Sequence, residues 1–223
     1  MLGSRNPFDM PEKLPVFPLT GAVLMPFGHL PLNIFEPRYI QMIDDALGME
    51  RLIGMIQPRL AQGDPVPDDA ALYDIGTVGR IIQFQDSGDG HYLITLEGLA
   101  RFRVASVYPA SDGLYGYRCV EAEYECFQHD LTPTEHDDGP GRGRILELVH
   151  DYFGDKDIDA DWNAVSQAPY EALVASLAMS CPFAPEEKQA LLECDTHEDR
   201  AHMLISLFEM STMTTQDHGM FKH

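Results

Sequence analysis

Glu36 and Arg38 are an acid and a base that stand two positions apart in "LPLNIFEPRY", Leu30 to Tyr39, and side chains of these types could take part in chemistry. Such a pair could supply catalytic charges, clamp a ligand, or belong to a structural corner. Pro37 suits the first position of a helix, and a carboxylate just before it is favoured by the helix dipole and the free amides. We therefore expect Glu36 to cap a helix and Arg38 to pair with a carboxylate elsewhere, as in a structural corner.

The motifs of two common chemistries are absent from the sequence. A P-loop ends in Gly-Lys so that backbone amides cradle the phosphates, but no glycine precedes Lys13, Lys156, Lys188 or Lys222. A nucleophile elbow has the form G-x-S-x-G, and no serine here has a glycine two positions before it. The sequence predicts neither an ATPase nor a hydrolase of that type, and it leaves a dispersed Ser/Lys or Ser/His pairing open.

The segment "HEDRAH", His197 to His202, comes nearest to a metal motif. A zinc-protease helix has H-E-x-x-H because residues four apart share a face, whereas residues five apart differ by about 140° on an ideal helix. The acidic run Asp151 to Asp161 lacks the glycine that a calcium loop has at its sixth position. We expect two exposed histidines, a solvated acidic loop, and no catalytic residue, metal or cofactor.

Composition excludes several further classes. The chain has 223 residues, of which 44% are hydrophobic, and a formal net charge of −21. That charge repels phosphate backbones and anionic lipid, so we expect no nucleic-acid partner and no membrane partner. No apolar run reaches the roughly 20 residues of a membrane span, and the N-terminus lacks a signal-peptide core, so a cytoplasmic protein is expected. The cysteines form no C-x-x-C pair, and we expect free thiols at Cys119, Cys126, Cys181 and Cys194.

The elements that would position these residues divide into two parts. Residues 14–128 follow an N-terminal arm of residues 1–13 and are expected to be β-rich. Arg101 and Arg103 alternate with Phe102 and Val104, as in a strand with one buried face. Expected strands cover Leu52 to Gln57, Tyr73 to Phe84, Tyr92 to Leu96, Phe102 to Tyr108 and Tyr117 to Phe127. The exception is a helix from Pro37, with Tyr39, Met42, Ile43 and Ala46 on one face and Gly48 at its end.

The second part is expected to be helical. Residues 129–144 are polar and broken by Pro and Gly, which indicates a linker or loop. Residues 145–212 then show helical stripes, and residues 213–223 form a tail. Thr196 with Asp199 resembles a capping box for the last helix. The three apolar stripes are Ile145, Leu148, Val149 and Tyr152; Tyr170, Leu173, Val174 and Leu177; and Ala201, Leu204, Ile205 and Phe208.

Several motifs in this order resemble the N-terminal substrate-recognition (La) domain of the ATP-dependent protease Lon. The family has a first strand of the type L-P-[VL]-F-P-L and then L-P-L-x-I-F-E-P-R-Y. The resemblance extends from about Leu14 to Thr212. The segments that carry it are "LPVFPL" from Leu14, "LPLNIFEPRY" from Leu30, "DIGTVGRI" from Asp74, "LEGLARFRV" from Leu96 and "PFAPEEKQALLECDTHEDRAHMLISLF" from Pro182.

The resemblance implies an α+β fold, in which a PUA-like, partly closed β-barrel precedes a small α-helical bundle. In full-length Lon this region precedes ATPase and Ser/Lys protease modules, and it helps to recognise substrates. The expected function here is a non-catalytic, stand-alone adaptor or weak chaperone in protein quality control. Its expected partners are unfolded or client proteins and full-length Lon. The family signature at the strand-to-helix corner is Phe35, Glu36, Pro37, Arg38 and Tyr39.

Two hypotheses about a site remain. The loop "GAVLMPFGH", from Gly21, could offer Val23, Leu24, Met25 and Phe27 as an adaptable apolar surface for clients if these side chains are exposed, and otherwise they fill the core. The alternative function is a small-ligand protein or enzyme with a site in the cleft between barrel and bundle. Dispersed residues would serve it, such as His29, Tyr39, Arg80 or His150.

Overall fold

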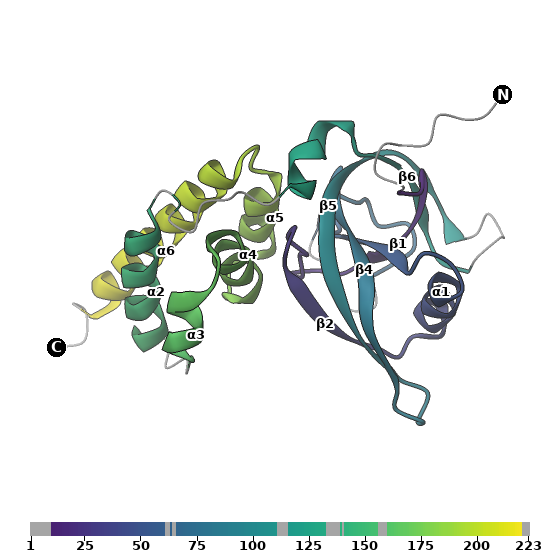
Figure 1. Cartoon of the computed structure of the whole chain (residues 1–223), viewed down its shortest axis with the longest axis horizontal. Helices are drawn as coiled ribbons and strands as arrows, with labels where there is room; N and C mark the ends of the chain where they lie inside the picture. The colour runs from purple at the N-terminus through teal and green to yellow at the C-terminus, as the bar shows by residue number, and fades with distance from the viewer. Residues whose placement is uncertain are drawn as a thin grey trace.

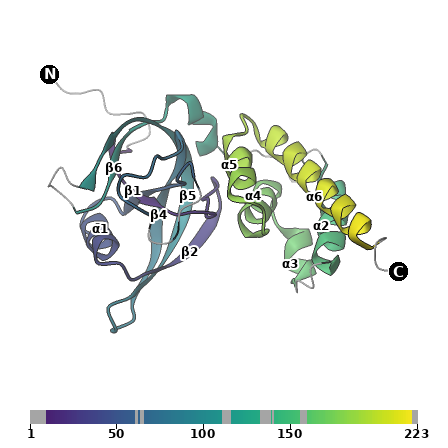
Figure 2. The ribbon, with the colours of Figure 1, turned by 180° about the vertical axis from the view of Figure 1, so that it is seen from behind.

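The computed structural model describes residues 10–60, 63, 66–110, 116–132, 139, 141–155 and 160–219, with only the backbone for residues 155 and 212–219. A β-barrel lobe and a helical lobe lie next to each other along the long axis of the molecule (Figures 1 and 2). This is the α+β arrangement that the resemblance implied.

The barrel lobe is built on a mixed six-stranded sheet in the order β2-β5-β4-β3-β1-β6. β5 pairs along its first half with β2 and along its second half with β6, so the barrel is only partly closed. The pairs are antiparallel except β1 with β3. The strands are β1 (Lys13–Pro18), β2 (His29–Ile34), β3 (Leu52–Ile56), β4 (Ile75–Asp86), β5 (Tyr92–Tyr108) and β6 (Cys119–Glu123).

β5 is one strand of 17 residues where the sequence predicted two separate strands. Alternate residues Ile94, Leu96, Gly98 and Ala100 are all buried, so the period-two pattern continues through the middle. Gly98 and Ala100 carry too little apolar surface to show that pattern in the sequence. β6 is shorter than predicted, because the chain turns at Tyr124 into the 3₁₀ helix η2 (Glu125–Leu131).

Helix α1 (Pro37–Leu47) confirms the helix expected after the signature segment. Proline stands at its first turn, and Gly48 follows its last residue. Its apolar face packs into the barrel core, with Tyr39, Met42, Ile43 and Ala46 all buried.

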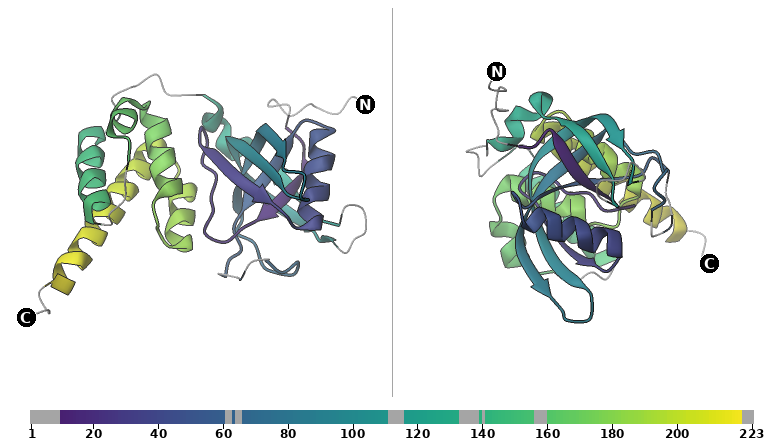
Figure 3. Two further views of the ribbon diagram at one scale, coloured as in Figure 1. Left: turned by 90° about the horizontal axis from the view of Figure 1, so that it is seen from below. Right: turned by 90° about the vertical axis from the view of Figure 1, so that its right-hand side faces the viewer.

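The helical lobe contains α2 (Arg142–Asp155), α3 (Trp162–Gln167), α4 (Tyr170–Ser180), α5 (Pro185–Glu193) and α6 (His197–Gly219). All three predicted stripes supply its packing: eleven members are buried, and Ile205 is half-buried against them. The predicted cap of α6 is confirmed, since the Asp199 amide donates to Thr196 Oγ1 at 3.0 Å. α2 begins inside the predicted linker, and α6 continues past residue 212, away from the barrel (Figure 3).

Two further expectations concern the state of the cysteines and the presence of membrane-spanning segments. All four cysteines are free thiols, and only Cys126 is exposed. Across the part of the chain that the structure describes, no helix has the length and apolar character of a membrane span.

Candidate functional site

The loop proposed for client contact lies between the two lobes. Val23, Leu24 and Met25 are buried, and they divide between two cores. Val23 and Met25 pack with the helices, whereas Leu24 packs inside the barrel. The Met25 amide also donates to the sulfur of Met179 in α4, at 3.5 Å. Of the two alternatives, an exposed surface or core filling, these three residues show core filling, because the helical lobe covers the loop.

Phe27 is the member of this group that remains half-buried. Its φ of 61° lies in the left-handed region, which is uncommon for a residue with a bulky side chain. Its amide donates to the carbonyl of Gly98 at 2.9 Å, and its ring centroid lies 6.3 Å from that of His197 in α6. Phe27 thus sits at the rim of the contact between the lobes.

In the signature corner, Glu36 and Arg38 contact each other and the neighbouring chain, but Glu36 does not cap the helix as expected. Glu36 stands at the N-cap of α1, but its side chain caps no amide. It accepts instead from Arg38 Nε at 3.0 Å. Arg38 was expected to pair with a carboxylate elsewhere, and Asp68 supplies it; Arg38 also donates to the carbonyl of Val66 at 3.0 Å. The carboxylate is thus used to orient the arginine that holds the segment at Val66 to Asp68.

The other signature residues have opposite environments. Tyr39 is buried against Phe17, with ring centroids 4.3 Å apart, and burial raises the pKa of Tyr39 to about 12. Phe35 is 53% exposed, although a core position would suit it better. Pro37 begins α1.

The residues named for a cleft between the lobes do not converge. His29 is exposed on β2, 4.0 Å from Glu97, and Arg80 is exposed on β4. Tyr39 lies in the barrel core, and His150 lies on α2 with its ring 4.9 Å from that of Trp162. These four side chains form no common site.

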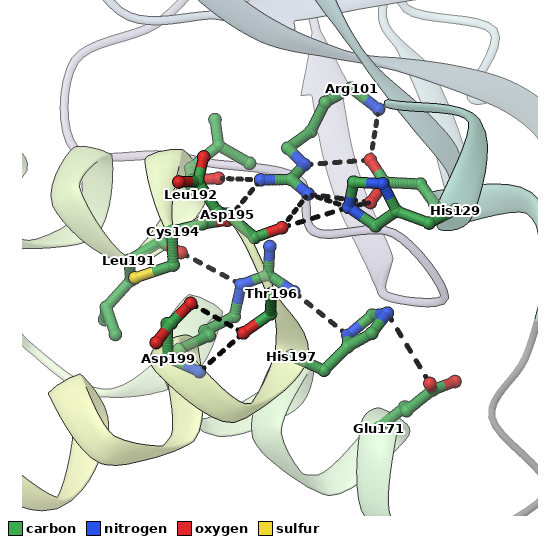
Figure 4. Close-up of polar contacts among 12 residues, drawn as sticks. Arg101, His129, Glu171, Leu191, Leu192, Cys194, Asp195, Thr196, His197 and Asp199 are labelled. Atoms are coloured by element: carbon green, nitrogen blue, oxygen red, sulfur yellow. Dashed lines mark hydrogen bonds and ion pairs between the residues drawn. The ribbon is translucent and has the colours of Figure 1, made fainter. Parts of the chain in front are cut away.

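A buried polar cluster, which the sequence did not reveal, joins the lobes instead (Figure 4). Arg101 of β5 is 1% exposed, although the alternation around it predicted a solvent-facing side chain. Its Nε lies 2.8 Å from Asp130 Oδ2, and its Nη2 lies 2.9 Å from Asp130 Oδ1. It also donates to the carbonyls of Leu192 and Cys194 at the end of α5. Burial would raise the pKa of Asp130, but the hydrogen bonds and charge of Arg101 outweigh it and lower that pKa.

Arg200 of α6 supports the same end of α5. Its Nε donates to the carbonyl of Leu191 at 2.9 Å, and its Nη1 lies 3.3 Å from His197 Nδ1. Because arginine only donates, His197 Nδ1 must be the acceptor in that contact. His197 Nε2 lies 3.5 Å from Glu171 of α4. The expectation of two exposed histidines is therefore confirmed for His202 and wrong for His197, whose side chain is 18% exposed.

His129 lies at the solvent edge of this inter-lobe cluster. Its Nε2 lies 2.9 Å from Arg101 Nη2 and 3.0 Å from the carbonyl oxygen of Asp195. The guanidinium of Arg101 is thus surrounded by acceptors of the protein itself. Such an arrangement fixes the position of the two lobes relative to each other.

Three exposed apolar side chains lie on the β4–β5 hairpin, which projects beyond the rest of the barrel (Figure 1). Leu93, Phe84 and Ile82 are 45%, 42% and 41% exposed. We call this region, with the adjacent part of β2, the β-tongue: residues 31–35 and 82–95. The sequence predicted the strands but not this exposure, which depends on the neighbours that leave them uncovered.

Two hollows adjoin the β-tongue and share Pro31, Leu32 and Asn33. The larger, about 620 Å³, is also lined by Gln83, Phe84, Gln85, Leu93, Ile94 and Thr95. None of these nine residues carries a charge. The smaller, about 200 Å³, reaches Phe35, Glu36 and the end of β1. The larger hollow of the β-tongue therefore offers an uncharged, partly apolar surface that is open to solvent.

Comparisons with known proteins agree on one family. The family model described as "ATP-dependent protease La (LON) substrate-binding domain" matches residues 13–209. Lon protease 2 of Myxococcus xanthus is 38% identical over 214 residues, which cover 92% of this chain and 24% of that protein. Lon protease of Haemophilus influenzae is 25% identical over 206 residues, covering 88% of this chain and 24% of that protein. The chain thus spans about a quarter of the length of these relatives.

Solved structures show the same fold. A Lon N-terminal domain protein from Xanthomonas campestris has a TM-score of 0.59 at 22% identity, covering 87% of this chain and 97% of that one. The N-terminal domain of Lon protease from the Mycobacterium avium complex has a TM-score of 0.60 at 17% identity, covering 88% and 98%.

Proposed function

The chain belongs to the family of the Lon substrate-binding domain, and from this premise we propose that it binds unfolded or damaged client proteins without acting on them chemically. The observation that carries the proposal is the family match over residues 13–209. The non-catalytic part of the proposal is supported by the absence of a P-loop and a nucleophile elbow from the 223 residues.

The proposed client surface is the β-tongue. Leu93, Phe84 and Ile82 leave apolar area in water, and an unfolded chain exposes apolar side chains that gain free energy when they cover such area. The loop at Val23 to Met25 cannot serve in this conformation, because both lobes cover it. Client contact on the β-tongue would leave the inter-lobe cluster undisturbed.

We further propose that the protein acts as an adaptor or weak chaperone in cytoplasmic quality control. In this role it would hold clients, while an ATPase and protease partner such as full-length Lon would unfold and cleave them. Affinity capture from lysate with and without ATP tests this step. ATP-dependent recovery of Lon supports it, and no association with purified Lon at micromolar concentration contradicts it.

Client binding itself is tested with a permanently unfolded, fluorescently labelled model protein. Anisotropy should show binding by the native chain and at least fivefold weaker binding by the Leu93→Ser, Phe84→Ser double variant. The matched control is Met49→Ser with Leu60→Ser, because these side chains are 65% and 71% exposed but lie outside the β-tongue. Absence of binding by the native chain would overturn the function, and equal losses in both double variants would overturn the assignment to the β-tongue.

A further inference from the structure

One face of the β-tongue carries no charge, and strand register shows which side chains make it. Asn33, Leu93 and Gln85 form one cross-strand row, and Pro31, Thr95 and Gln83 form the next such row on the same side. Rows two residues apart share a face of a sheet. We call these six side chains the amide face. The chain as a whole contains 36 acidic and 15 basic residues, so an uncharged face of this size is a distinct local feature.

The amide face is suited to hydrogen bonding with a peptide backbone. Asn33, Gln83 and Gln85 each carry both a donor and an acceptor without a charge. The Thr95 hydroxyl lies 3.0 Å from Gln83 Oε1 and orients that amide. Leu93, 45% exposed, lies in the central strand and offers apolar contact between the amides. A segment that crosses the face can thus bury one apolar side chain while its backbone stays hydrogen-bonded.

Charges stand only at the ends of this face. Beyond the register shift between Ile81 and Gln83, Glu97 pairs with His29 on one side and with Arg80 on the other, so positive and negative groups occur together there. At the other end, Asp86 and Asp89 belong to the hairpin turn, where their carboxylates accept from backbone amides and from Ser87. The interior of the face offers no counter-ion to a charged client side chain, and removing an unpaired charge from water is costly.

The free edge of β2 does not provide an alternative mode of binding. Among the described residues β2 pairs only with β5, so its other edge is unpaired. Pro31 stands in the middle of this edge strand and has no N–H to donate, which blocks continuous pairing with an added strand. A client is therefore expected to lie across the amide face, and not alongside β2.

We propose that the β-tongue selects extended, uncharged client segments of mixed apolar and amide composition, which bind across the amide face. This inference rests on the proposed function and names the client class. Each residue of an extended strand spans about 3.3 Å and neighbouring strands lie about 4.8 Å apart, so about three to four extended residues cross the three strands of the face. The net charge of −21 adds a long-range repulsion against acidic segments.

The test compares three labelled peptides of equal length. One has an uncharged core of Leu, Phe, Asn and Gln, and the others replace two amide positions in that core by Glu or by Lys. Anisotropy is measured at low salt and at about 0.5 M salt, where charge interactions beyond a few ångströms are screened. The uncharged peptide should bind at least tenfold more tightly than the Glu peptide at low salt, and salt should change its Kd less than twofold. The Lys peptide should lose its binding at high salt.

The matched variants add one carboxylate inside or outside the face. Gln83→Glu should weaken binding of the uncharged peptide at least fivefold. Gln41→Glu, on the exposed side of α1, should leave the Kd of that peptide within twofold of its value for the native chain. The proposed client class would be overturned if the two variants had equal effects. It would also be overturned if, at high salt, the Lys peptide bound more tightly than the uncharged peptide. If the unfolded protein still binds to the native chain in that case, client binding stands. If it does not bind at all, the proposed function fails first.

Discussion

The guanidinium of Arg101 and the carboxylate of Asp130 form a two-point contact, at 2.8 and 2.9 Å, while both side chains are buried. Arg101 belongs to the barrel, and its remaining hydrogen bonds reach the carbonyls of Leu192 and Cys194 at the end of α5. A single side chain therefore connects β5, η2 and α5, and it stabilises the arrangement of the two lobes.

Replacing Arg101 should destabilise the fold strongly. Arg101→Met leaves the carboxylate of Asp130 buried without its partner, and breaking a buried pair from one side costs about 3–5 kcal/mol. Arg103→Met is the control, because Arg103 lies two residues on along the same strand but is exposed, so a loss below about 1 kcal/mol is expected. Urea unfolding measures both. Equal losses of unfolding free energy in the two variants would show that the buried pair does not stabilise the contact between the lobes.

Stability should fall when the medium becomes acidic, through His197. Burial and the charge of Arg200 lower the pKa of His197 below its ordinary 6.5, against the attraction of Glu171. The unfolded chain therefore takes up a proton at a higher pH than the folded protein. The contribution of His197 is fully present above pH 6.5 and is lost as the pH falls toward the lowered pKa.

The measurement is the free energy of unfolding at a series of pH values on either side of 6.5. His197→Gln should reduce the slope of the free energy of unfolding against pH below pH 6.5. His202→Gln, an exposed change on the same helix, should keep the native profile. A native slope that survives in His197→Gln would assign the pH dependence to another group.

Gly98 should not tolerate a side chain. A Cβ at this position would lie 2.0 Å from the carbonyl oxygen of Met25, so the loop between the lobes would have to move. We expect Gly98→Ala to cost about 1–3 kcal/mol or more, as other overpacked sites do. Gly143→Ala in α2 meets no atom within 4 Å and should instead stabilise by about 0.5–1 kcal/mol. Thermal unfolding of the two variants compares them, and a neutral Gly98→Ala would mean that the loop yields easily.

Pro31→Thr should promote self-association. The substitution restores an N–H in the middle of β2, whose outer edge has no partner among the described residues, and that edge then becomes complete for pairing with a second copy. Asn33→Thr is the control, because it raises strand propensity in the same strand without adding a donor. Sedimentation velocity should detect new oligomers for Pro31→Thr alone, and a monomeric Pro31→Thr would show that other features protect the edge.

Much of the fold could be predicted from local patterns. Tyr39, Met42, Ile43 and Ala46 repeat at helical spacing and form the buried face of α1, and Thr196 caps α6 through the Asp199 amide. The ordered motifs from Leu14 onward also indicated the family that the comparisons show. Patterns of this kind succeed because helix periodicity and capping involve residues within a few positions of each other.

The candidate site was less accessible to sequence reasoning. Val23, Leu24 and Met25 were correctly read as apolar, but whether they face a client or a core depends on the helical lobe that covers them. The exposure of Leu93 and Phe84 depends in the same way on tertiary packing, because none of the described elements covers these side chains.

Arg101 and Arg103 show where the limit lies. Their spacing alone determined that both point to the same side of β5, because side chains alternate along a strand. Only the tertiary structure decided that Arg101 is buried under η2 and α5 while Arg103 remains in solvent. The partners of Arg101 stand 28 to 94 residues away along the chain, and no local pattern relates residues so distant. The sequence by itself therefore determined most of the elements and the family, and packing between distant segments decided which side chains are buried and which are exposed.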